Sequence, residues 1–378
     1  MEKIHQWGIL ILINLIKKDD VNLKVNCEER SVIKELSQFF TFSIPGAQYM
    51  PAYRNRRWDG KIKLFNINTQ ELPVGLYEYI NRFCVDRGYE IDGYKPSFSS
   101  IKDEHICSFM ENHIKPVAGG KRVEAHEHQK DAIRHVINNN RCTLLSPTGS
   151  GKSLIIYSLM RYYLDVIPED KKILIIVPTT SLVTQMYSDF EEYSIDNNWD
   201  VSENCHKVMA GKDKTHKDKR VIISTWQSIY KMDKKYFSDY YAVFGDECHL
   251  FKSKSLTTIM SKLSNCPYRV GTTGTLDGTK VHRLVIEGAF GPVYEVTSTE
   301  DLIKKDILSD FEIDCILLKY SDKMRNRCKR ISYQEEIDEL VGYEERNKFV
   351  TNLVGSLKGN TLVLFQYVAK HGRPLFEM

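Results

Sequence analysis

The sequence lacks the features by which composition alone would assign it to a functional class. Its 53 Lys and Arg residues nearly cancel its 50 Asp and Glu residues, leaving a formal charge of +3 at pH 7. Any nucleic-acid-binding surface therefore has to be local. Its nine cysteines form no CxxC pair. This argues for a reducing compartment such as the cytoplasm, and against a disulfide framework or a zinc module.

The chain also lacks a long apolar run. The run at residues 8–16, "GILILINLI", is much shorter than the ~20 residues that a membrane-spanning helix requires. Glu2 lies beside Lys3 ahead of this run, and no small-residue cleavage site follows it, so a signal peptide explains it poorly. We expect a buried strand or an N-terminal extension there.

With 378 residues the chain is long enough for two or three domains. Residues 1–95 mix short apolar runs, turn signals and basic-aromatic patches, which suits a small α+β domain. Proline and paired glycines in "KPVAGGKR" mark a boundary, and we expect a linker at 96–122. An α/β domain is expected at 123–310, and the start of a second, incomplete one at 311–378.

Residues 123–310 alternate short apolar runs with longer amphipathic segments. The runs predicted to be strands are "RCTLLS" (141–146), "KKILIIVP" (171–178), "RVIIST" (220–225), "YAVFGDE" (241–247) and "YRVGTTGT" (268–275). Helical patterns lie at 152–167 and 180–193. Buried strands that alternate with helices form parallel sheets covered on both faces, so the predicted fold class is α/β.

A second alternation begins near the end of the sequence. "FEIDCILLKY" (311–320) and "NTLVLFQYV" (360–368) are predicted to be strands, with one acidic helix at 333–349 between them. These pieces are too few to close a sheet. We therefore expect a longer product or a second polypeptide to supply the rest of this domain.

The first predicted strand leads into "SPTGSGKSLI" (146–155), which contains the GK[ST] end of a phosphate-binding loop. Ser146 stands where the strict pattern has glycine. Glycines let backbone N–H groups turn inward around phosphate oxygens, and a helix N-terminus adds partial positive charge. The residues predicted to bind ATP here are Thr148, Gly149, Ser150, Gly151, Lys152 and Ser153. Lys152 would reach the β- and γ-phosphates and Ser153 would bind Mg²⁺. The alternative is a glycine-rich turn that happens to end in GKS.

The stretch "DECH" (246–249) follows another predicted strand. An acidic residue at the carboxyl end of a neighbouring parallel strand lies over the same crevice as the phosphate loop. Asp246 is therefore predicted to hold Mg²⁺, and Glu247 to orient and deprotonate the attacking water.

The same stretch has a second interpretation as a metal cluster. A zinc site built on Cys248 and His249 would need two further ligands. Only Cys205 and His206 are spaced as such a pair, and we favour ATP hydrolysis.

Together these motifs resemble those of the superfamily 2 helicases and translocases of the DEAH/DExH type, and among them the helicases of T-even phages. The similarity is carried, in order, by "RRWDGKIKLF", "HQKDAI", "PTGSGKSL", "ILIIVPTTSLVTQM", "STWQS", "DECHL", "GTTGTL", "YQEEI" and "LVLFQYVAKHG". It implies two RecA-like domains with ATP in the cleft between them and a small N-terminal DNA-binding domain. The implied function is an ATP-driven motor that remodels branched DNA or RNA–DNA hybrids in phage recombination, repair and replication.

The resemblance also implies roles for particular residues. Gln129 would bind the adenine, and His128 stands where the family has an aromatic residue. Thr273 and Thr275, with His249, would couple the state of the phosphates to the grip on the strand. The residues implied to contact the nucleic-acid backbone are Pro178, Thr179, Thr180, Thr225 and Gln227.

Each of these assignments has a plain structural alternative. Thr180 or Ser181 would be the N-cap of a helix, "GTTGT" would be a turn, and Gln129 would be a solvated helix residue.

The segment "PAYRNRRWDGKIK" (51–63) is predicted to bind DNA. Guanidinium groups at Arg54, Arg56 and Arg57 pair with phosphates, and the Trp58 face stacks on bases. The alternative is a basic hairpin with Trp58 in the core. Two other basic runs, at 207–220 and 322–330, are expected to be solvated loops.

Two functions therefore stay open. The first is an ATP- and Mg²⁺-dependent motor acting on DNA. The second is a nucleic-acid-binding or annealing module with a weak or uncoupled ATPase, because residues 311–378 would leave the second motor domain incomplete. In that case its arginine finger would be absent, and we would expect slow hydrolysis and no unwinding by this chain alone.

Overall fold

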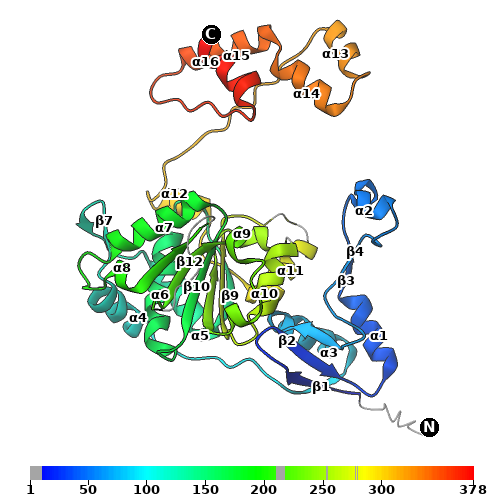
Figure 1. Ribbon diagram of the computed structural model, residues 1–378, viewed down its shortest axis with the longest axis vertical. Helices are drawn as coiled ribbons and strands as arrows, with labels where there is room; N and C mark the ends of the chain where they lie inside the picture. Colours follow the sequence, from blue (N-terminus) through cyan, green and yellow to red (C-terminus); the bar gives the residue numbers. More distant parts are fainter. Residues whose placement is uncertain (1–10, 210–217, 253, 277, 279) are drawn as a thin grey trace, which may run out of the picture. The chain divides into compact units, whose positions relative to one another are not determined.

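Figure 1 shows the computed structural model, which describes residues 11–209, 218–252, 254–276, 278 and 280–378. The chain divides into two compact units between Ser309 and Asp310. Most of the basic run at 207–220 lies outside the described residues, as does the start of the apolar run at 8–16. No helix in the described ranges is long and apolar enough to cross a membrane.

The centre of the first unit is a parallel sheet of seven strands in the order β11-β12-β10-β13-β14-β9-β15. In chain order the strands are β9 (Arg141–Leu145), β10 (Lys172–Val177), β11 (Cys205–Val208), β12 (Val221–Thr225), β13 (Tyr240–Gly245), β14 (Tyr268–Thr273) and β15 (Val293–Glu295). All five runs predicted to be strands are confirmed, and so is the α/β class. The edge strands β11 and β15 were not predicted, because "CHKV" and "VYE" are short and only partly apolar.

Helices cover both faces of this sheet (Figure 1). One face carries α5 (Glu127–Asn139), α6 (Lys152–Val166), α7 (Thr180–Tyr193) and α8 (Val201–Asn204), and the other carries α9 (Trp226–Ile229), η4 (Lys235–Phe237), η5 (Cys248–Lys252), α10 (Lys254–Lys262) and α11 (Lys280–Phe290). In β10, Ile173 and Ile175 pack into the core on the first face, while Leu174 and Ile176 pack into the core on the second. A strand buried on both faces has no polar side, which is why these segments read as continuous apolar runs.

A smaller mixed sheet of four strands, in the order β5-β2-β1-β6, forms the N-terminal domain. Its elements are β1 (Leu12–Lys17), β2 (Asn22–Asn26), α1 (Arg30–Phe39), β5 (Glu71–Pro73), η2 (Val74–Leu76), α3 (Tyr77–Arg87) and β6 (Glu90–Gly93). The apolar run at 8–16 thus ends in β1, where Ile13 and Leu15 are buried.

A hairpin projects from this domain (Figure 1). It consists of β3 (Thr41–Ser43), η1 (Ala47–Tyr49), α2 (Pro51–Arg54) and β4 (Lys61–Lys63). We call residues 41–63 the arm. Residues 51–63, predicted to bind DNA, form its tip and its returning strand.

The stretch expected to be a linker, 96–122, is structured. It contains α4 (Asp103–Phe109), the π-helical turn η3 (Met110–Ile114) and the short hairpin of β7 (Val117–Ala118) and β8 (Lys121–Arg122). Ile106, Met110 and Ile114 belong to the same core as α5 and α6. After the sheet, α12 (Thr299–Lys304) ends the first unit.

The second unit consists of helices. They are α13 (Asp322–Cys328), α14 (Tyr333–Val341), α15 (Glu344–Ser356), the π-helical turn η6 (Val368–Gly372) and α16 (Arg373–Glu377). The single acidic helix predicted at 333–349 is two helices separated at Gly342. The basic run at 322–330, predicted to be a loop, forms α13.

The two strands predicted in this unit are wrong. Residues 311–320 and 360–367 form no strand, Val368 begins η6, and side chains such as Leu317, 89% exposed, lie in solvent. An extended apolar segment becomes a strand only when neighbours satisfy its backbone and cover its side chains. No such neighbour exists among residues 310–378, all of which are described.

Candidate active site

The phosphate loop lies between the end of β9 and the start of α6. Gly149 and Gly151 have φ angles of 83° and 82°, a left-handed conformation that favours glycine. A Cβ at Gly149 would lie 2.6 Å from a methyl carbon of Leu308, and one at Gly151 would overlap the Gln129 side-chain amide. Only glycine fits at both positions. The loop that they form lies at the N-terminus of α6, and helix N-termini bind anions.

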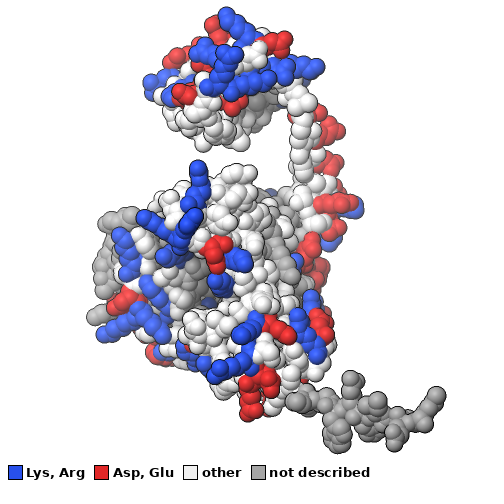
Figure 2. Space-filling view, turned by 90° about the vertical axis from the view of Figure 1, so that its right-hand side faces the viewer, with Lys and Arg blue, Asp and Glu red and all other residues white. Residues whose placement is uncertain are grey.

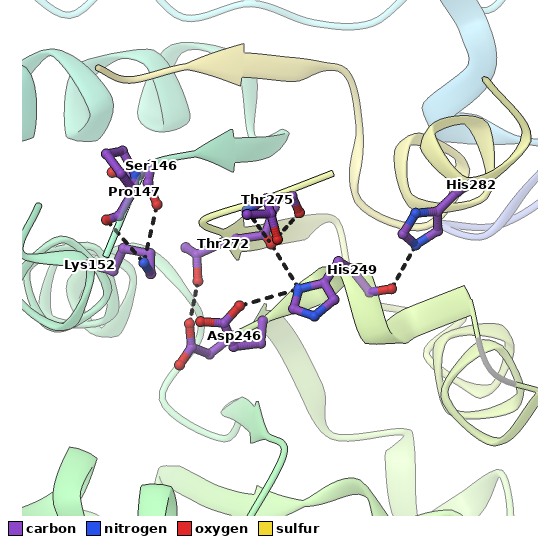
Figure 3. A network of polar contacts seen from close by, with 10 residues as sticks. Ser146, Pro147, Lys152, Asp246, His249, Thr272, Thr275 and His282 are labelled. Atoms are coloured by element: carbon purple, nitrogen blue, oxygen red, sulfur yellow. Dashed lines mark hydrogen bonds and ion pairs between the residues drawn. The ribbon is translucent and has the colours of Figure 1, made fainter. Parts of the chain in front are cut away.

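Hydrogen bonds inside the loop hold its shape. The Ser150 hydroxyl donates to the Pro147 carbonyl at 2.7 Å and lies 2.6 Å from the Ser146 hydroxyl. The Lys152 ammonium donates to the carbonyls of Ser146 (3.1 Å) and Pro147 (3.2 Å) (Figure 3). Ser146, which departs from the strict motif, therefore helps to order the loop. The Lys152 ammonium is held against the loop's own carbonyl groups.

Gln129 is 4% exposed, so the solvated-helix alternative is wrong. Its side-chain oxygen accepts from the His126 N–H at 2.9 Å, and its amide nitrogen donates to the Ser150 carbonyl at 3.0 Å. His128 Nε2 lies 3.0 Å from the same carbonyl, and burial lowers the pKa of His128. The start of α5 is thereby attached to the phosphate loop.

Asp246 and Glu247 directly follow β13. The Thr272 hydroxyl, from the adjacent strand β14, donates to Asp246 Oδ1 at 2.8 Å (Figure 3). Glu247 has a φ of 48°, which is unusual for a residue with a side chain and occurs where surrounding contacts enforce it. Because β14 also pairs with β9, both carboxylates lie at the same edge of the sheet as the phosphate loop.

A chain of polar contacts runs from Glu247 to the end of β14 (Figure 3). His249 Nδ1 lies 3.3 Å from Glu247 Oε2 and 3.0 Å from the Thr273 hydroxyl oxygen. The Thr273 hydroxyl donates to the Thr275 carbonyl at 2.9 Å. The structure thus brings together the three predicted coupling residues, and Thr272 and Thr273 belong to a strand rather than to the turn of the alternative interpretation.

Ser153 and the cysteines lie apart from this chain of contacts. The Ser153 hydroxyl hydrogen-bonds to Asp189 of α7. Cys248 is fully buried in the core under β13 and β14, and burial raises the pKa of its thiol well above the usual value. Within the described residues no three His, Cys, Asp or Glu side chains gather as a metal cluster.

The predicted nucleic-acid contacts lie at the carboxyl ends of β10 and β12, which are neighbours in the sheet. The Gln227 side chain donates to the Pro178 carbonyl at 3.3 Å, so the two motifs meet. Thr179 is the N-cap of α7, with its hydroxyl accepting from the Leu182 N–H at 3.3 Å, so the alternative that made Thr180 or Ser181 the cap is wrong. Thr179 and Thr180 are exposed, whereas Thr225 is 3% exposed.

The tip of the arm carries its arginines in solvent. Arg54, Arg56 and Arg57 are exposed, and none has a carboxylate partner in the described parts of the chain. They line an open hollow of about 600 Å³ with Tyr53 and Trp58. Lys and Arg side chains gather on the face that carries the arm (Figure 2).

Trp58 is half-buried within the arm. It lies outside the core of the N-terminal domain, so the alternative that placed it there is wrong. Its indole N–H donates to the Lys61 carbonyl at 2.9 Å.

Sequence reasoning missed Thr272 and His282, whose imidazole Nε2 lies 2.7 Å from the His249 carbonyl oxygen (Figure 3). Thr272 lies inside the "GTTGT" motif, beside the residue to which a role was assigned. His282 belongs to no motif, and only the packing of α11 against the sheet brings it to the site.

The sequence matches two family models, "DNA helicase UvsW, N-terminal" over residues 12–92 and "Type III restriction enzyme, res subunit" over residues 122–278. It is 35% identical over 370 residues to the ATP-dependent DNA helicase UvsW of Enterobacteria phage T4, covering 95% of this chain and 71% of that protein. It is 24% identical over 209 residues to the DNA 3'-5' translocase XPB2 of Sulfurisphaera tokodaii, covering 54% and 43%.

Two crystal structures of T4 UvsW are similar to the chain. One has a TM-score of 0.68 with 34% identity, and covers 97% of this chain and 72% of that one. The other has a TM-score of 0.66 with 36% identity, and covers 75% and 99%. These similarities confirm the resemblance to superfamily 2 helicases that the motifs indicated. The chain therefore belongs to the UvsW family of ATP-dependent DNA helicases.

Proposed function

We propose that this chain hydrolyses ATP between its phosphate loop and its DECH stretch, and uses the reaction to remodel branched DNA. One observation carries the proposal. Three adjacent strands, β13, β14 and β9, deliver the two carboxylates, the coupling residues and the loop to one edge of the sheet. Membership of a helicase family makes the chain an ATP-hydrolysing enzyme, and this geometry supports the roles proposed for its residues.

In the proposed mechanism the phosphate loop binds the β- and γ-phosphates through its backbone N–H groups and Lys152. The Lys152 ammonium leaves the two loop carbonyls for phosphate oxygens of higher charge. Gln129, already joined to Ser150, would place the adenine relative to the loop. The binding pocket is thus assembled from α5 and the loop together.

Glu247 orients a water molecule towards the γ-phosphorus and accepts its proton. The water oxygen bonds to phosphorus while the bond to the bridging β–γ oxygen breaks, which releases ADP and phosphate. Asp246 and Ser153 offer the carboxylate and hydroxyl oxygens that Mg²⁺ prefers beside phosphates and waters, with Asp246 held in place by Thr272. When bound there, Mg²⁺ would neutralise charge on the phosphates.

Two surfaces would hold the nucleic acid. Thr179 and Thr180, exposed at the start of α7, would contact the backbone of one strand, with Pro178 and Gln227 fixed beside them. The arginines of the arm would hold a second segment of duplex or branch through phosphate contacts. We place this activity in the host-cell cytoplasm, where all nine cysteines, free thiols in this structure, would stay reduced.

The test is the ATPase rate of the full chain without nucleic acid and with single-stranded DNA, forked DNA, four-way junctions and RNA–DNA hybrids. We expect DNA to stimulate turnover severalfold, and branched DNA to act at lower concentration than single strands. Turnover that no nucleic acid changes, together with DNA binding that ATP does not affect, would overturn the motor in favour of a binding or annealing module. Stimulation by hybrids alone would reassign the substrate.

A further inference from the structure

Helix α11 contacts both the N-terminal domain and the DECH stretch. Its residues Ile286 and Phe290 belong to the core that lies under the DECH stretch, together with Cys248 and Phe251. Its residue Leu284 belongs instead to the core of the N-terminal domain. One helix thus contributes side chains to both hydrophobic cores.

The contacts of α11 with the DECH stretch are close. The His282 imidazole, 5% exposed, donates through Nε2–H to the His249 carbonyl at 2.7 Å (Figure 3). The Phe290 ring packs against Gly245, where a Cβ would lie 2.5 Å from a ring carbon. It also makes an edge-to-face contact with Phe251, with 5.0 Å between ring centroids. A shift of α11 therefore requires the DECH backbone to shift with it, because packed cores do not yield continuously.

The contacts of α11 with the N-terminal domain are equally specific. The Tyr79 hydroxyl of α3 donates to Glu287 Oε2 at 2.6 Å. Glu287 is 2% exposed, and its other oxygen accepts from Arg283 Nε (2.9 Å) and from the Val293 N–H (3.2 Å). A Cβ at Gly75 would overlap the Glu287 carbonyl oxygen, so the backbone of η2 lies directly on α11. Burial raises the pKa of Tyr79 to about 12, so its hydroxyl keeps the proton that it donates.

We propose that α11 transmits the DNA-bound state of the N-terminal domain to the hydrolytic residues, with Tyr79, Glu287 and His282 as positioning residues. The proposal rests on the proposed roles of Glu247 and His249. The domain that carries the arm holds one side of α11 through Tyr79 and Gly75, and α11 holds the His249 backbone through His282. The His249 side chain in turn contacts Glu247 and Thr273. Both sites thereby contact one helix, and they would be coupled through it if each biases its position.

The chain offers a matched control for the contact between Tyr79 and Glu287. Tyr89 donates to Glu35 Oε2 at 3.1 Å, and Arg87 Nε lies 3.3 Å from the same carboxylate oxygen. This set has the same three residue types as Tyr79, Glu287 and Arg283, and its hydrogen bond and ion pair join α1 to the end of α3 within the N-terminal domain. Tyr79→Phe and Tyr89→Phe therefore remove the same group, and only the first removes it from the proposed route.

The experiment measures kcat and KM for ATP in the full chain, with and without saturating forked DNA. We expect Tyr79→Phe to lose most of the stimulation by DNA, a loss within the range of ordinary coupling factors, with KM for ATP and DNA affinity close to wild type. Tyr89→Phe should behave as wild type. Equal stimulation in the two variants would overturn the proposal.

A second pair of variants tests the other end of α11. His282→Leu removes the donor to the His249 carbonyl, and His282→Gln keeps an N–H at the position of Nε2. We expect stimulation to fall in the leucine variant and to return in the glutamine variant. Residues that act through one element give non-additive effects, so adding Tyr79→Phe to His282→Leu should reduce stimulation little further. Fully additive losses, or no rescue by glutamine, would contradict transmission through α11.

The outcome is separable from that of the proposed function. If Lys152→Ala retains normal turnover, the phosphate-loop assignment fails whatever the α11 variants do. If Lys152→Ala is inactive and wild-type turnover responds to DNA, equal behaviour of Tyr79→Phe and Tyr89→Phe removes only the role of α11.

Discussion

The nucleotide site and the arm are both proposed to bind phosphates, but they differ in how their side chains are held before a ligand binds. At the site, Gln129 and Asp246 each make a hydrogen bond that fixes the side chain before any ligand arrives, and two loop carbonyls hold the Lys152 ammonium at the loop. On the arm, Arg54, Arg56 and Arg57 are exposed and have no carboxylate partner in the parts of the chain described. Chemistry on a phosphate needs preorganised groups, because reorganisation during the reaction raises the barrier. Holding a polyanion needs only charge that can adapt and release counterions.

This comparison predicts that substitutions at the site change rates, and that substitutions on the arm change affinity and its salt dependence. The largest effect is expected at Lys152. Lys152→Ala removes the charge that meets the γ-phosphate, and we expect ATP turnover to fall about a thousandfold or more while DNA affinity stays near wild type.

Steady-state phosphate release and fluorescence anisotropy on labelled forked DNA measure the two quantities. Lys130→Ala, which removes a lysine paired with Glu127 on α5, is the control and should keep both. Normal turnover in Lys152→Ala would remove the phosphate-loop assignment.

Glu247→Gln should have the next largest effect. The amide keeps the shape and the hydrogen-bonding reach of the side chain but cannot accept the proton from water, and general-base losses of this kind cost about 10²–10⁴ in rate. MgATP binding should persist, so the bound state should accumulate. A filter assay for trapped nucleotide, run beside the turnover assay, measures both. Turnover within a few-fold of wild type would show that another group is the base.

Replacing Arg54, Arg56 and Arg57 by Ala should weaken DNA binding and flatten its dependence on salt. Each arginine–phosphate interaction that is removed lowers the slope of log affinity against log salt by about 0.9. ATP turnover without DNA should not change, because no side chain of the arm takes part in the hydrogen bonds that shape the phosphate loop. If the slope of log affinity against log salt is unchanged, the arm has a purely structural role.

The control for the arm is the double change Lys234→Ala and Lys235→Ala. It removes two exposed basic residues at the start of η4 and should leave the slope as in wild type.

The smallest effect is expected at Thr179, which lies outside both the nucleotide site and the arm. Its hydroxyl caps α7 and is also a proposed contact to the strand. Thr179→Ala should lower the free energy of unfolding by about 1 kcal/mol, and Thr179→Ser should restore it. Urea denaturation measures the loss. If the alanine variant is as stable as wild type, the cap contributes nothing and the hydroxyl is available for the strand alone.

The nucleotide site could be predicted further from sequence than the rest of the molecule. Its residues lie in short motifs at the ends of strands that are apolar throughout, and a parallel sheet aligns such ends. What the motifs could not indicate is the set of bonds across elements. Gln129 reaches Ser150, Thr272 holds Asp246 and His282 holds His249 because of strand order and helix packing, which local sequence does not encode.

The fold was predictable where burial on both faces left an unbroken apolar run, as in β10, β12 and β13. The fold was not predictable where pairing with a neighbouring strand decides whether a segment forms a strand. Edge strand β15 is only three residues long and exists through its pairing with β9. Residues 311–320 are more apolar than β15, yet they form no strand, because within the second unit no partner strand is present.

The most direct test of the account is a titration of ATPase rate with forked DNA, comparing the wild-type chain with the variant in which Arg54, Arg56 and Arg57 are Ala. We predict that both rates rise to the same plateau, and that the variant needs more DNA to reach half of it. The difference between the two half-saturating DNA concentrations should narrow as salt increases. The wild-type chain neutralises more phosphates, so its affinity falls faster with salt. The central claim is that the residues at the sheet edge determine the rate of hydrolysis, whereas the arm determines DNA affinity. A lower plateau at an unchanged half-saturating concentration would contradict it.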